Sequence, residues 1–125
     1  AGAFDIDAAA GTGSFLASDI NQTARWFNYN ATDGTTMRLF AVRDGAGGLH
    51  LALDACDVCY RAKKGYSQLG SDMVCNNCGN RFPITGVGET ASGGGCWPSY
   101  ISYTLADGNV VVRLADLDSK AFMFP

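Results

Sequence analysis

Two Cys-x-x-Cys pairs, separated by fifteen residues, are the feature of this 125-residue chain that most constrains its fold. They are Cys56 with Cys59 and Cys75 with Cys78. A turn of this length places two thiolates on one metal ion, and two such turns supply the four sulfurs of a tetrahedral site. Zinc, mononuclear iron and iron–sulfur clusters all accept four thiolates. The spacing therefore predicts a metal site and leaves the metal open.

The residues that follow the two pairs differ. Gly79 comes directly after Cys78 and permits the positive φ of a tight metal-binding turn, whereas Tyr60 stands in the equivalent place after Cys59. The first turn is therefore expected to be less regular than the second. Neither pair is followed by histidine, which excludes covalent attachment of a c-type haem.

A fifth cysteine, Cys96, follows three glycines that let the backbone approach a neighbouring group closely. It is a candidate fifth metal ligand, a replacement for one of the four, or a bridge between two metals. The alternative is a buried free cysteine that packs as a small hydrophobic residue. Disulfide pairing is a further alternative for all five cysteines, since an oxidising compartment would allow two bridges and one unpaired thiol.

Two weaker candidate ligands lie close to the cysteines in the sequence. His50, the single histidine, comes six residues before Cys56, but it alternates with the leucines of a predicted strand and is expected to face solvent. Met73 comes two residues before Cys75 and would suit copper, although a methionine in the core is the simpler interpretation.

The sequence predicts a mainly β fold (a β-rich α+β class), in which a small single domain of β-hairpins carries a cysteine-rich metal-binding loop. Alternating apolar residues predict a hairpin over 35–54 with a glycine-rich turn at 44–48. An Asp-Gly turn predicts a second hairpin over 100–117. The cysteine-rich stretch between the hairpins is expected to be mostly loop. Short helical turns are expected near 19–24 and 116–121, where an aspartate could cap the first turn.

Composition and motifs exclude several classes of protein. The net charge of −3 argues against binding to nucleic acid, because no basic surface is available to replace the counterions of phosphates. No apolar run approaches the roughly 20 residues that span a bilayer, so no direct membrane span is expected in this chain. The chain has no Ser/His/Asp arrangement and no phosphate-binding loop, and an enzyme is not predicted.

A long pattern around the cysteines resembles the FtrD-like family of membrane iron–sulfur-containing proteins. The matching residues are Asp54, Ala55, Cys56, Cys59, Lys64, Gly65, Tyr66, Gly70, Asp72, Met73, Val74, Cys75, Cys78, Gly79, Arg81, Phe82, Gly94, Gly95, Cys96 and Pro98. One departure is Ser71, which stands between Gly70 and Asp72. The resemblance covers about residues 15–124 and predicts an Ala/Gly-rich N-terminal arm at 1–14 followed by an FtrD-like metal-binding domain at 15–125.

The resemblance implies a domain at the outer face of a bacterial or archaeal membrane, which accompanies iron-uptake permeases and carries a redox metal. The expected location is periplasmic, cell-surface or extracellular, with a membrane anchor in the precursor as an open alternative. The expected partners are redox or membrane transport proteins, and self-assembly is a further alternative.

The leading functional hypothesis is a metal-binding, electron-transfer module. One thiolate-bound metal centre is expected, held by Cys56, Cys59, Cys75 and Cys78 with Cys96 as an extra ligand or neighbour, and iron or an iron–sulfur cluster is favoured over zinc or copper. A second hypothesis is a structural zinc–thiolate domain that serves protein binding or assembly. A third is a protein that handles copper or iron and passes the metal on.

Overall fold

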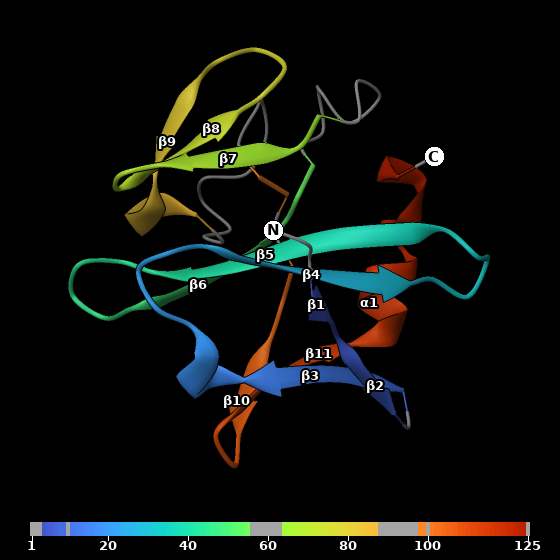
Figure 1. Ribbon diagram of the computed structural model, residues 1–125. Coiled ribbons are helices and arrows are strands. Elements are labelled where there is room, and N and C mark those ends of the chain that lie inside the picture. The colour runs from blue at the N-terminus through green and yellow to red at the C-terminus, as the bar shows by residue number, and fades with distance from the viewer. Residues whose placement is uncertain (1–3, 10, 56–63, 88–97, 100, 125) are drawn as a thin grey trace.

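The computed structural model describes residues 4–9, 11–55, 64–87, 98–99 and 101–124. These residues form three small β-sheets and a short helix, which confirms the mainly β prediction. Figure 1 shows the sheets as layers: the sheet of β4, β5 and β6 lies in the middle, β7 to β9 lie on one side of it, and β3 and β11 lie on the other. The central sheet thus separates two hydrophobic interiors.

The central sheet has the order β1-β4-β5-β6. Its strands are β1 (Phe4–Asp5), β4 (Arg25–Asn30), β5 (Thr36–Arg43) and β6 (Leu49–Leu53). The hairpin of β5 and β6 confirms the first predicted hairpin. Its turn is closed by backbone bonds from Asp44 N–H to the carbonyl of Gly48 and from Gly47 N–H to the carbonyl of Asp44. β6 ends three residues before the first cysteine of the sequence motif, so the central sheet leads the chain directly toward it.

The second sheet has the order β10-β11-β3-β2. Its strands are β2 (Asp7–Ala9), β3 (Thr12–Leu16), β10 (Thr104–Ala106) and β11 (Asn109–Arg113). The hairpin of β10 and β11 confirms the second predicted hairpin. Its Asp-Gly turn has positive φ at both residues, 53° at Asp107 and 78° at Gly108, which matches the right-handed twist of the strands.

The third sheet corrects the prediction that the cysteine-rich stretch is mostly loop. The strands β7 (Tyr66–Leu69), β8 (Asp72–Cys75) and β9 (Arg81–Pro83) pair antiparallel in the order β7-β8-β9. A two-residue turn, Gly70–Ser71, joins the first two strands, and Gly70 has φ of 61°. The strands are only three or four residues long, which is why alternation alone did not reveal them.

The predicted helical turns are confirmed at one place and wrong at the other. Near the C-terminus, α1 (Leu114–Asp118) and the 3₁₀ turn η5 (Ala121–Met123) occupy the predicted region. Near the N-terminus, the 3₁₀ turn η1 (Ala17–Asp19) ends where the predicted turn was to begin, and β4 follows. Neither η1 nor α1 has a side-chain cap on its first turn.

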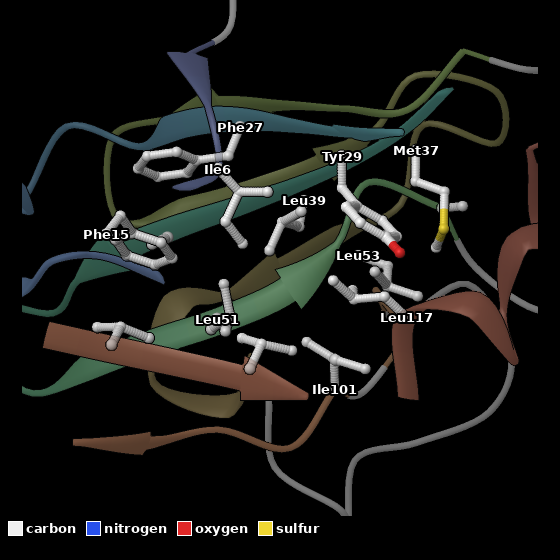
Figure 2. Packing of buried hydrophobic residues seen from close by; sticks show 14 of the residues in the cluster. Ile6, Phe15, Phe27, Tyr29, Met37, Leu39, Leu51, Leu53, Ile101 and Leu117 are labelled. Atoms are coloured by element: carbon white, nitrogen blue, oxygen red, sulfur yellow. The ribbon is translucent and has the colours of Figure 1, made fainter. Parts of the chain in front are cut away.

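β5 supplies both hydrophobic interiors because its side chains alternate between the two faces of the central sheet. Met37, Leu39 and Ala41 enter the larger cluster, which lies between the central sheet and the second sheet. Figure 2 shows this cluster, to which β3, β4, β6 and α1 also contribute side chains. Phe40 and Val42 enter the smaller cluster beneath the third sheet. All five of these side chains are fully buried.

Candidate metal centre

The second cysteine pair lies at the turn between β8 and β9. Cys75 is the last residue of β8 and is buried, whereas Cys78 is exposed. Two backbone bonds close the turn, from Gly79 N–H to the carbonyl of Cys75 (2.8 Å) and from Cys75 N–H to the carbonyl of Asn80 (3.0 Å). Gly79 has φ of 77°, as its position after the pair predicted. Two backbone bonds and the positive φ of Gly79 thus fix the turn that carries both cysteines.

Asn76, the first residue between the two cysteines, connects this turn to the segment 64–67. Its backbone N–H donates to the carbonyl of Gly65 (3.0 Å), and its side-chain amide donates to the carbonyl of Lys64 (2.8 Å). Its side-chain oxygen accepts a bond from the hydroxyl of Ser67 (2.8 Å). Asn76, which lies between the two cysteines of the second pair, thus holds the segment 64–67 that follows the first pair in the chain.

Asp54 holds the same segment from the other side. Its carboxylate accepts a bond from the backbone N–H of Tyr66 (2.9 Å) and lies 3.7 Å from Nε of Arg38. The buried indole N–H of Trp26 lies near this carboxylate without reaching hydrogen-bonding geometry among the described residues. Tyr66 is in turn the partner of Cys75 across β7 and β8.

The Asp54 carboxylate is buried, with 7% of the residue exposed. Burial raises its pKa to about 6, and the nearby donors Trp26, Tyr66 and Arg38 offset only part of this effect. Arg38 is half exposed, so its attraction is weakened by solvent. The buried Asp54 carboxyl, with its raised pKa, therefore lies two residues before Cys56.

The segment that follows Cys96 in the sequence also returns to the end of β6. The backbone of Ser99 accepts a bond from Leu53 N–H (3.0 Å) and donates one to the carbonyl of Ala55 (2.8 Å). The hydroxyl of Ser99 accepts a bond from Nζ of Lys120 (2.9 Å). Residues 53–55 thus contact both the chain after Cys96 and, through Asp54, the chain opposite Cys75.

His50 is buried, so the prediction that it faces solvent is wrong. Its Nδ1 lies 2.8 Å from the carbonyl of Val87, and its Nε2 lies 2.7 Å from the carboxylate of Asp44. Both ring nitrogens thus lie within hydrogen-bonding distance of a protein oxygen, so neither is directed toward a metal site among the described residues. The bond from His50 is the largest cause of the lowered pKa of Asp44. The third sheet covers the face of β6 that alternation assigned to solvent.

Met73 is a core residue, as the simpler interpretation of the sequence predicted. Its side chain is fully buried in the smaller hydrophobic cluster with Phe40, Tyr66 and Phe82. It lies on β8 opposite Gln68 and Phe82, between its neighbouring strands.

The other predicted ligands, Cys56, Cys59 and Cys96, lie outside the described residues. Within the described part of the chain, no three His, Cys, Asp or Glu side chains come together as a metal site. The fit of a metal can therefore be judged at Cys75 and Cys78, where two thiols on a closed turn are a donor set that suits zinc, iron or Cu(I).

Two residues of this region were not singled out as functional by the sequence. Asn76 was visible only as a residue between two cysteines, and Asp54 only as part of a motif. Their roles depend on partners twelve residues away in the chain, which no local pattern shows. The close contact between the buried Asp54 carboxylate and Gly65, which has a positive φ, can be recognised only in the folded structure.

Among the described residues, no helix has the length and apolar character to cross a membrane. Comparison with curated proteins and with solved structures finds no match to this chain. A family model does match, and it covers residues 20–124, which include all five cysteines, strands β4, β5 and β6 of the central sheet, and the turn of the second cysteine pair. The chain therefore belongs to the family described as membrane iron-sulfur containing protein FtrD-like.

Proposed function

We propose that this protein is an electron-transfer module with one thiolate-bound metal centre, in which iron or an iron–sulfur cluster is favoured. Cys56, Cys59, Cys75 and Cys78 would hold the metal, and Cys96 would be a further ligand or a close neighbour. A bound iron centre would supply a one-electron redox couple, whose potential depends on the surrounding hydrogen bonds and on exposure.

The observation that carries this proposal is the contact of two other chain segments, at Tyr66 and at Ser99, with residues 53–55. Ala55 is bonded through its backbone to Ser99, and Asp54 is bonded to Tyr66, the strand partner of Cys75. Cys56 directly follows Ala55 in the chain, and Cys96 precedes Ser99 by three residues. At no more than about 3.6 Å per residue, these short connections keep the three cysteine segments within reach of one another.

The exposure of Cys78 supports electron transfer in particular. Cys75 is buried on β8 while Cys78 lies at the surface, so a metal held by both would have one protected and one accessible side. The turn carries Asn76 and Asn77 between the cysteines and Gly79 after them, and no acidic residue occurs in the sequence from position 73 to position 87. We propose that a redox or membrane transport partner approaches at this turn, on the outer side of a membrane, in accord with the family's description.

A structural zinc site is the second candidate, and the shape of the third sheet favours it. β7, β8 and β9 are short, and the second cysteine pair lies at the end of β8 where a metal would fasten the sheet. Closed sites with four thiolates are most often structural when zinc occupies them.

Metal analysis of natively purified protein, combined with an ultraviolet–visible spectrum, tests the proposal. Iron with thiolate charge-transfer bands that bleach reversibly on reduction is the expected result. Zinc in a colourless protein would favour the structural site instead, and copper would favour metal handling. The variant Cys75→Ser is expected to lose most of the metal, and full retention would contradict a four-thiolate centre.

A further inference from the structure

Asn76 and Asn77 occupy the two places between Cys75 and Cys78, yet they differ in their contacts. Both are exposed, but Asn76 makes three hydrogen bonds to the segment 64–67, whereas no side-chain bond is found for Asn77 among the described residues. A residue between two metal-binding cysteines needs none of these bonds to let the thiolates meet a metal. The bonds of Asn76 therefore serve the connection between the two cysteine pairs.

The segment that Asn76 holds is also held by Asp54. The Asp54 carboxylate accepts the N–H of Tyr66, and it occupies the space where a side chain at Gly65 would begin. Gly65 has φ of 64°, so the segment follows a path that other residues rarely adopt. The segment 64–66 is thus held by Asp54 on one side and by the turn of the second cysteine pair on the other.

We propose that Asn76 and Asp54 are positioning residues that join the two halves of the metal centre before the metal binds. This inference rests on the proposed function, because it assigns the two cysteine pairs to one centre. Asp54 and Tyr66 close the loop that contains Cys56 and Cys59, so the entropy of closing that loop is lost on folding and not on metal binding. Metal release would then require the segment 64–66 to detach from the turn.

Removal of the Asn76 side chain is therefore expected to speed metal release, and removal of the Asn77 side chain is not. Outer hydrogen bonds that orient metal ligands are typically worth about 10–100-fold in affinity. We expect Asn76→Ala to increase the rate of metal transfer to an excess of a chromogenic chelator by about 10-fold or more. Asn77→Ala is the matched control, with the same change in size and charge at the adjacent position.

Amide hydrogen exchange of the metal-free protein gives a second measurement that needs no bound metal. The backbone N–H groups of Tyr66 and Asn76 are expected to be protected in the metal-free wild-type protein and in Asn77→Ala. The N–H of residue 76 is expected to exchange faster in Asn76→Ala. If that variant does not fold, Asn76→Asp keeps the oxygen and removes the donor to Lys64, with Asn77→Asp as its control.

Equal release rates in Asn76→Ala, Asn77→Ala and the wild-type protein would overturn the proposal, as would unprotected N–H groups at Tyr66 and Asn76 without metal. A wild-type protein that holds no thiolate-bound metal would contradict the proposed function instead. In that case the exchange measurement still decides whether Asp54 and Asn76 hold the segment.

Discussion

Asp54 determines which residue can stand at position 65. A Cβ at Gly65 would overlap the Asp54 carboxylate, and the φ of 64° adds strain for any other residue. Gly70 offers a matched comparison, because its φ is 61° and a Cβ there would meet no atom within 4 Å. The pair separates the cost of backbone strain from the cost of displacing the carboxylate.

Gly70→Ala is expected to lower the free energy of unfolding by about 1 kcal/mol, from backbone strain alone. Gly65→Ala is expected to cost about 2 kcal/mol more than that, because overlap with a packed neighbour must be relieved as well. Urea unfolding of the two variants measures the difference. Equal losses would mean that the Asp54 carboxylate moves aside freely and does not hold the segment.

Met73 is expected to act as a core residue and not as a metal ligand. Met73→Leu conserves volume, so it should cost less than about 1.5 kcal/mol of stability and leave the bound metal unchanged. Met37→Leu is the control, since Met37 is also fully buried but lies in the other hydrophobic cluster. Metal analysis of both variants checks the prediction, and metal loss in Met73→Leu alone would identify Met73 as a ligand.

At the scale of elements, the sequence predicted the two long hairpins and missed the third sheet. β5, β6 and β11 are each five or more residues long, and Asp107–Gly108 is a strong turn signal. β7 and β8 have four residues each, and their turn Gly70–Ser71 is a weaker signal. His50 was misplaced for the same reason: the sheet that covers it was not predicted.

In the candidate site, too, the local features could be predicted from the sequence and the long-range contacts could not. The spacing of the cysteines is local and was sufficient to predict a metal site. The contacts of Asp54 with Tyr66 and of Ser99 with Ala55 join residues from different elements, and only the packed chain brings them together. The sequence therefore indicated candidate ligands, while the residues that we propose to orient them were found only in the structure.

Asp118 connects two elements, the end of α1 and the turn between β4 and β5. Its carboxylate accepts bonds from the hydroxyls of Tyr29 and Thr32, both 2.8 Å, and from the backbone N–H of Thr32 at 3.1 Å. These bonds, led by that from the Thr32 hydroxyl, lower the pKa of Asp118 below its ordinary value of 3.8. The ionised carboxylate is therefore the form that stabilises the folded chain.

Asp118→Asn is expected to lower the melting temperature at neutral pH. The control Asp116→Asn, on the same helix, is expected to change it less, because the Asp116 pair with Arg113 is exposed. A lowered pKa contributes stability above the ordinary pKa and loses it as the pH falls through the folded value. The difference between wild type and Asp118→Asn should therefore shrink in acid. A difference that stays constant down to the acid range would contradict the role of the charge.

At the scale of the whole molecule, the two hydrophobic clusters share the central sheet but not their outer layers. The larger cluster joins the central sheet to the second sheet and to α1, and the smaller one joins it to the third sheet (Figure 1). Four aromatic rings follow one another through the smaller cluster, Trp26, Phe40, Tyr66 and Phe82, with centroids 5.9 to 6.4 Å apart. The candidate metal centre adjoins this smaller cluster at Cys75.

Metal removal is therefore expected to affect the third sheet and to leave the larger cluster folded. The larger cluster holds residues from β3, β4, β5, β6 and β11 and needs no cysteine among its described members. Hydrogen exchange with and without bound metal should show faster exchange in β7, β8 and β9 after chelation, with the N–H groups of Tyr66 and Asn76 still protected relative to an unfolded chain, and unchanged exchange in β3 and β11. Faster exchange throughout would show a chain that unfolds as one unit without metal, as classical zinc fingers do. Unchanged exchange in the third sheet would separate the metal from that sheet altogether, which would contradict ligation by Cys75 and Cys78.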